Sequence, residues 1–222
     1  ASTCTGSPDK TEADMANDVV QTRHGGNIVR KTDANPEGKG ANGFMLDWYR
    51  SEPKGLVAKP QRQVLAEFFT SMLVLSAHFN YKPVVGVPNF LYYVDGAWSL
   101  SLIAPDEWSE SRRTGFVGVC ILQRDMTWTI EPSENIAGND SIADEIAKFY
   151  DAFAHTLDTD MTLEEILPFH ENSMRYYQRL YANALSRSIR GAIILGDQRS
   201  INCRDWRMLL PRIDNILLAH KN

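Results

Sequence analysis

The stretch "NFLYYVDGAWSLSLIA", residues 89–104, decides the fold class of this sequence. Asp95 and Gly96 form a dipeptide that favours a two-residue type I′ turn, and aromatic and β-branched residues flank it. In the second arm, Ser99 and Ser101 alternate with apolar residues, as expected for a strand with one dry and one wet face. The stretch therefore predicts a β-hairpin.

Further strands are predicted on both sides of this hairpin. The segment "TGFVGVCILQ" (114–123) is apolar on both faces, which is typical of a central strand. The segment "RDMTWTIEP" (124–132) begins with a turn and continues as a strand, and residues 82–88 form a short strand or an extended link. Together these segments predict a small antiparallel β-meander of three to four strands.

Helical periodicity dominates the rest of the chain. Residues 60–79 carry apolar side chains at helical spacing on one wide face. After residue 133 the same periodicity predicts helices over 139–160, over 162–195 with an interruption near Pro168, and over 203–221 with a bend at Pro211. We therefore expect an α+β fold in which helices pack the sheet and a helical C-terminal lobe follows it.

The composition also divides the chain. Residues 1–58 are rich in Gly, Asn, Asp, Lys and Thr, and we expect a largely irregular N-terminal arm whose cluster "FMLDWY" (44–49) clasps the body. Residues 59–222 are predicted to form a single α+β domain, made of a helix and the meander over 59–132 and a helical lobe over 133–222.

The composition narrows the classes of protein to consider. The formal net charge of −5 provides no general attraction to nucleic acid, so a nucleic-acid partner is not expected. The three cysteines are widely spaced and form no CxxC motif, which excludes a disulfide framework or zinc signature and favours a reducing compartment. With no signal peptide and no apolar run of about 18 residues, we expect no membrane span and a cytoplasmic location.

The end of the opening stretch, "LIAPDEW" (102–108), has two interpretations. Pro105 followed by two acidic residues is typical of a capped helical turn after a buried strand. Alternatively, aromatic side chains with a polar end and two carboxylates form the rim of a concave binding site. The binding residues in that case are Tyr92, Tyr93, Asp106, Glu107, Trp108 and Trp128.

A family resemblance rests on the same region. The run "YYVDGAWSLSLIAPDEW" followed by "FVGVCILQRDMTW" resembles the core signature of the DUF2452 family, and "GLVAKP" and "FTSMLVLSAHFNYKPVVG" resemble its bacterial branch. The resemblance covers residues 55–132, with Ser109 standing where the family pattern has Gly after the tryptophan. It implies no activity and no cofactor.

No recognisable catalytic or metal motif is present. His170 follows Glu164 and Glu165, but Pro168 lies between them and disrupts the shared helical face that a metal site requires. His78 near the end of the 60–79 helix is expected to cap or pack. The sequence therefore predicts neither a metal nor a cofactor, and its catalytic residues are unknown if it has any.

A row of arginines near the C-terminus offers a docking surface. At about 100° per residue, one edge of the helix carries Arg175, Arg179, Arg187 and Arg190. This edge pairs with the acidic segment 131–165, which holds ten acidic residues and one lysine, or it docks an acidic or phosphate-bearing partner.

Three functional hypotheses follow. The leading one is a non-catalytic protein-interaction or assembly factor whose partner is another protein, because no catalytic motif is present and the predicted sheet is rich in Trp and Tyr. The alternative is a small-molecule-binding protein or enzyme with a site at the 105–108 turn, where Asp106 or Glu107 acts as polar anchor or general base. The third is binding of a phosphate-bearing or acidic partner through the arginine edge.

Overall fold

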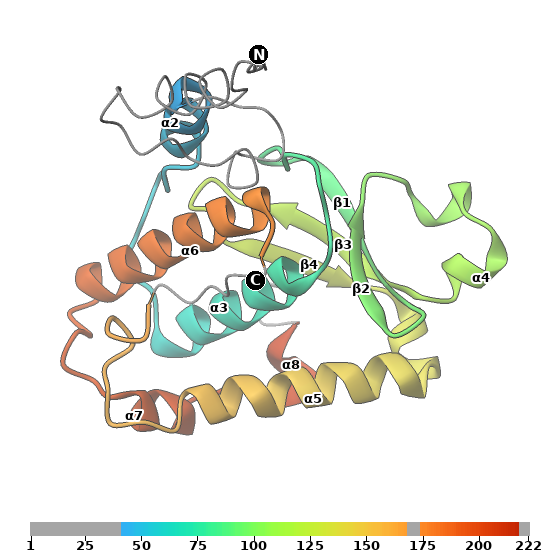
Figure 1. Cartoon of the computed structure of the whole chain (residues 1–222). Helices are drawn as coiled ribbons and strands as arrows, with labels where there is room; N and C mark the ends of the chain where they lie inside the picture. Colours follow the sequence, from blue (N-terminus) through green and yellow to red (C-terminus); the bar gives the residue numbers. More distant parts are fainter. Residues whose placement is uncertain (1–40, 168–173, 218–222) are drawn as a thin grey trace, which may run out of the picture. The chain divides into compact units, whose positions relative to one another are not determined.

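The computed structural model describes residues 41–167 and 174–217 of the chain. The chain divides into two units, Ala1–Lys39 and Gly40–Asn222. His170, which the sequence disfavours as a metal ligand, and the cysteine at position 4 lie outside the described residues. The fold set out below is that of the second unit, shown in Figure 1.

A four-stranded antiparallel sheet forms the β part of the fold. Its strands are β1 (Pro88–Val94), β2 (Ala97–Ser101), β3 (Phe116–Leu122) and β4 (Trp128–Pro132). The predicted hairpin is confirmed, because β1 pairs with β2 in the register Val94↔Ala97. Asp95 and Gly96 have φ values of 53° and 76°, as a type I′ turn requires.

The strand order is β2-β1-β3-β4, so β3 pairs with β1 and not with β2 as a simple meander would have it. The reason lies at the other edge of β2. There the backbone N–H of His78 donates to Trp98 O at 2.9 Å, and Leu100 N–H donates to His78 O at 3.1 Å. This edge is therefore already occupied, and the chain passes through η1 (Pro105–Glu107) and α4 (Glu110–Arg113) to reach the free edge of β1.

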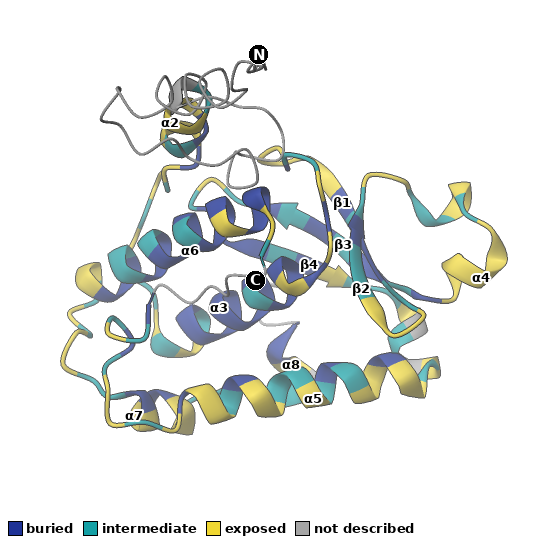
Figure 2. Ribbon diagram, in the orientation of Figure 1, coloured by how far each residue is buried: buried dark blue, intermediate teal, exposed yellow. Residues whose placement is uncertain are grey.

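Helix α3 (Gln61–Ser76) lies at the centre of the molecule and matches the helix predicted over 60–79. It packs against β4, α5 (Asp140–Thr156) and α6 (Tyr176–Leu195). Figure 2 shows that most of α3 is buried, whereas α5 exposes one side to solvent. Apolar burial of this extent is the main source of stability for such a fold.

Aromatic packing joins the helices. The ring of Phe69 on α3 lies 5.5 Å from those of Phe149 and Phe153 on α5, in edge-to-face geometry. Trp128 on β4 and Trp206 on α7 (Cys203–Met208) are both fully buried. The sheet and the C-terminal helices therefore share one core, and the predicted α+β class is confirmed.

Two predicted helical segments are shorter than expected. The N–H and the hydroxyl of Thr162 both donate to Glu165 Oε2, at 2.7 and 2.8 Å, but residues 163–166 form a turn and helix α6 begins at Tyr176. The C-terminal segment is divided near Pro211 into α7 and α8 (Ile213–Ile216). Proline removes a backbone donor, which explains the break. Within residues 41–167 and 174–217, no helix is both long enough and apolar enough to pass through a membrane.

Within the segment predicted to be irregular, Ala41–Arg50 forms a helix, α2. The Asp47 carboxylate pairs with the Lys82 ammonium at 2.5 Å and accepts a hydrogen bond from the Tyr176 hydroxyl at 3.2 Å. The Arg187 guanidinium lies 4.3 Å from the centre of the Trp48 ring. These contacts fix one side of α2, and the opposite side faces solvent.

Candidate functional site

The 105–108 turn has the local structure that its sequence predicts. Pro105–Glu107 form a 3₁₀ turn in which Glu107 Oε1 accepts a hydrogen bond from the Ala104 N–H at 3.3 Å. The ring of Trp108 meets that of Tyr92 edge to face at 6.5 Å. The Arg112 guanidinium stacks on Trp108 at 4.3 Å from the ring centre. The turn is therefore a self-contained packing unit, with Asp106 and Glu107 exposed.

The six aromatic and acidic residues of the predicted rim do not share one cavity. Tyr92 is 3% exposed and donates its hydroxyl to Ile103 O at 2.9 Å, and burial raises its pKa to about 12. Tyr93 points to the other face of the sheet, against Trp98 at 4.9 Å. Trp128 is fully buried and lies far from Tyr92 along the sheet. Tyr92 pairs with Phe116 at the start of β3, whereas Trp128 pairs with Leu122 at the end of that strand.

The predicted arginine edge divides into two pairs. Arg187 donates to Ser51 O at 3.0 Å in addition to its contact with Trp48, and burial lowers its pKa. Arg190 donates to the backbone oxygens of Glu164 and Leu167. These two arginines hold the fold together through carbonyl groups, and not through the acidic side chains of 131–165. Arg175 and Arg179 are exposed.

The remaining candidates have packing roles. Cys120 and Cys203 are unpaired and buried, and burial raises the pKa of both thiols, that of Cys203 to about 11. His78 extends the sheet through its backbone. No cluster of three or more metal-ligating side chains occurs among the described residues.

An open cavity lies elsewhere, and sequence reasoning missed it. It has a volume of about 550 Å³ and adjoins a second cavity of about 430 Å³. Residues from three separate segments line both: Lys54, Gly55, Val85 and Arg124. Volumes of this size are typical of small-molecule sites.

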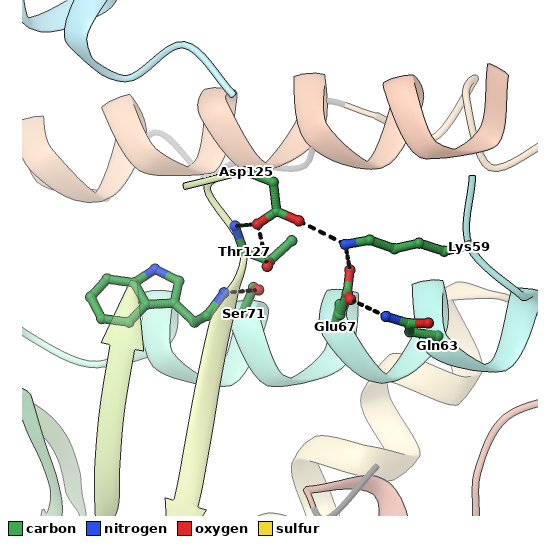
Figure 3. Close-up of polar contacts among 7 residues, drawn as sticks. Lys59, Gln63, Glu67, Ser71, Asp125 and Thr127 are labelled. Atoms are coloured by element: carbon green, nitrogen blue, oxygen red, sulfur yellow. Dashed lines mark hydrogen bonds and ion pairs between the residues drawn. The ribbon is translucent and has the colours of Figure 1, made fainter. Parts of the chain in front are cut away.

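Glu67, Asp125 and Thr127 line this cavity and belong to a network of hydrogen bonds and ion pairs with Lys59 and Gln63, which we call the floor network (Figure 3). The Lys59 ammonium lies 2.6 Å from Glu67 Oε2 and 2.7 Å from Asp125 Oδ2. Gln63 donates to the second Glu67 oxygen at 3.0 Å, and the Thr127 N–H and hydroxyl donate to Asp125 Oδ1 at 3.1 and 2.7 Å. Each of the four carboxylate oxygens therefore has a partner.

The electrostatics of this network determine what chemistry it can support. Burial by itself lowers the pKa of Lys59, but the hydrogen bonds to Asp125 and Glu67 outweigh it and the pKa is raised. Burial likewise raises the pKa of Asp125, but its bonds with Lys59 and Thr127 outweigh this and the pKa is lowered. Both groups stay charged near neutral pH, so the network holds a lysine cation between two carboxylates.

The floor network also positions the cavity walls. Lys59 joins the 51–60 link to α3 and to the β3–β4 turn, and its carbonyl accepts from Gln198 Nε2 at 3.0 Å. Further along the link, the Lys54 N–H donates to Arg124 O at 2.9 Å. Segments that lie far apart in the sequence are therefore held side by side at the cavity mouth.

A second unusual surface is the outward face of α2, which we define as Met45, Leu46, Tyr49 and Arg50. Its three apolar members are 51%, 52% and 68% exposed. Arg50 lines the 430 Å³ cavity, so this face ends at the cavity mouth. Val84, Val85 and Val87 near the mouth are also exposed. A contiguous apolar surface of this kind is a mark of recognition sites.

The comparison with protein families matches the region that contains the sheet and the network. Residues 55–152 match the family described as "Protein of unknown function (DUF2452)". This part of the chain is similar to the DUF2452 family. The resemblance predicted over 55–132 is thus confirmed, and the match extends into α5. No curated protein and no solved structure matches the chain.

The DUF2452 segment contains every residue of the floor network: Lys59, Gln63, Glu67, Asp125 and Thr127. Arg124 and Val85 also lie within it, and Lys54 lies one residue before it. Helix α2 and α6, which carry the outward apolar face and the arginines, fall outside the matched residues.

Proposed function

We propose that the protein is a non-catalytic protein-interaction or assembly factor that binds its partner through the outward face of α2. The observation that carries this proposal is the exposure of Met45, Leu46 and Tyr49 on a helix whose other side is fixed to the body. Exposing three large apolar side chains on one ordered helix costs solvation free energy, which a partner's apolar surface would recover.

The spacing on α2 fits a helix-in-groove mode of binding. Met45 and Tyr49 are four residues apart, as are Leu46 and Arg50, so the four side chains form one continuous stripe. Tyr and Arg are also the residue types that contribute most at interface centres. The face is held in place before binding, which lowers the entropic cost of association.

Charge complementarity points to the chemistry of the partner. Arg50 lies at the end of the stripe, and Arg179 lies on the same side of α6 as Tyr176 and Arg187, the residues that contact α2. Both arginines are exposed. We therefore propose a partner protein with an apolar groove rimmed by carboxylates.

The chemistry of the polar groups supports a binding role over a catalytic one. Lys59 and Asp125 are held in their charged states, and the thiols of Cys120 and Cys203 are buried with raised pKa values. The unpaired state of these two cysteines also supports our proposal that the protein works in the reducing environment of the cytoplasm.

The experiment that tests the proposal uses a photocrosslinking amino acid in place of Tyr49, introduced into the full chain in its source organism. We expect a specific crosslink to one protein, identified by mass spectrometry and then purified for direct titration. In that titration Leu46→Glu should weaken binding by about 100-fold, since it places a charge in an apolar contact.

The matched control is Leu102→Glu, which makes the same change at a residue that is 57% exposed on another part of the surface. It should leave the affinity unchanged. Equal weakening by both variants, or crosslinks from position 49 only to a second copy of the chain, would contradict the proposal.

A further inference from the structure

Two cationic residues, Lys54 and Arg124, line the 550 Å³ cavity. The hydrogen bond from the Lys54 N–H to Arg124 O, 2.9 Å long, places the two residues side by side. Both side chains are exposed and both line the two adjoining cavities. Among the residues that the structure describes, neither side chain forms a hydrogen bond or ion pair. Two cationic side chains that line the same cavity make its potential more positive and favour the binding of an anion.

The acidic groups beneath them do not supply that anion. The carboxylates of Glu67 and Asp125 already share Lys59 and accept from Gln63 and Thr127. Together with the Lys59 ammonium, the two carboxylates carry a net charge of −1. Arg50, Lys54 and Arg124, which line the two cavities, carry three positive charges. The site as a whole is therefore cationic within a chain of net charge −5.

The rest of the lining indicates an organic group on the ligand. Val85 and Leu122 provide apolar surface in the larger cavity, and Met126 does so in the smaller one. Thr129 and Gln123 add a hydroxyl and an amide. The lining therefore offers apolar surface beside polar groups, which suits a ligand that has both an organic and a polar part.

We infer that this cavity is a binding site for a small phosphate-bearing organic molecule, with its phosphate held between Lys54 and Arg124. A phosphomonoester carries nearly two negative charges at neutral pH, which matches the two or three cations that line the site. Arg can hold two phosphate oxygens at once, and Lys adds a mobile point charge. The site shares Arg50 with the outward face of α2, but Lys54 and Arg124, which hold the phosphate, lie outside that face.

The inference is tested with phenyl phosphate and inorganic phosphate, titrated into the full chain by calorimetry at constant ionic strength. We expect saturable binding of both, with phenyl phosphate at least several-fold tighter because its ring meets the apolar wall. Lys54→Ala and Arg124→Ala should each weaken binding by about tenfold or more, as expected for loss of one charge-assisted hydrogen bond.

Arg179→Ala is the matched control, because it removes an exposed arginine that does not line the cavity. It should bind as the wild type does, and circular dichroism should show all three variants folded. Binding that the Lys54 and Arg124 variants leave unchanged overturns the inference. So does the absence of saturable binding of either phosphate, or weakening by Arg179→Ala as large as theirs.

Discussion

The Lys59 ammonium lies 2.7 Å from Asp125 Oδ2, although the two residues are 66 positions apart. The same ammonium lies 2.6 Å from Glu67 Oε2 on α3. The side chains of Lys59 and Glu67 are 9% and 6% exposed, so this is a largely buried network. It joins the link that follows α2, the central helix and the β3–β4 turn at a single cation.

Replacing that cation should destabilise the protein strongly. Lys59→Met removes the shared partner and leaves two largely buried carboxylates close together. Removing one partner of a buried ion pair costs about 3–5 kcal/mol of stability. Asp125 is partly exposed, which favours the lower value of this range. We expect a loss of about 3 kcal/mol in the free energy of unfolding, measured by urea denaturation.

The control for this variant is Lys148→Met, which breaks the exposed ion pair with Glu145 on α5. Solvent screens that pair, so stability should hardly change. Similar losses for the two variants would show that the Lys59 network contributes no more than a surface pair.

The same network should make stability depend on pH in a definite direction. The pKa of Asp125 is lowered from its ordinary value near 3.8, so its contribution is present above that pH and is lost as the pH falls through the lowered value. The pKa of Lys59 is raised from 10.5, so its contribution is present below that pH and is lost as the pH rises through the raised value.

The variant Asp125→Asn isolates the acid side of this dependence. We expect the stability difference between wild type and this variant to be constant between about pH 5 and 9 and to shrink below about pH 4. Urea denaturation at a series of pH values measures it. A difference that stays constant down to pH 2 would show that the Asp125 carboxylate is not stabilised in the folded state.

The elements of the fold were predictable where local patterns determine them. Asp95-Gly96 determines a tight turn, and the apolar spacing of residues 60–79 determines a buried helix. The strand order was not predictable in this way, because it depends on His78 occupying the outer edge of β2. No local pattern around residues 97–101 reveals that contact.

The candidate site was harder to predict for the same reason. Its cavity combines residues 54–55, 85–86 and 122–129, which only the folded chain brings together. One signal was available: Glu67 is the only charged residue between positions 63 and 76, within an apolar stretch of α3. A charge in such a stretch requires a buried partner. Trp128 was misplaced because a tryptophan in a short strand fits a rim and a core equally well.

The hairpin turn provides a test of the backbone argument. Gly96 has φ = 76°, and a Cβ added there would meet no atom within 4 Å. Gly96→Ala should therefore act through backbone strain alone and cost about 1–2 kcal/mol in thermal or urea denaturation. Gly138→Ala is the matched control, since its surroundings are equally open and its φ lies outside the left-handed region. A smaller effect at Gly96 than at Gly138 would contradict the turn assignment.

The attachment of α2 to the body should depend on the guanidinium of Arg187. This group stacks on Trp48 and donates to Ser51 O, two contacts that a lysine ammonium cannot make together. Arg187→Lys should weaken the attachment by about 1–2 kcal/mol. Because proteolysis follows the population of the open state, trypsin should cut after Arg50 or Lys54 about tenfold faster.

Arg179→Lys, an exposed change on the same helix, should leave that rate unaltered. An unchanged rate in the Arg187 variant would show that Asp47, through Lys82 and Tyr176, is sufficient to hold α2.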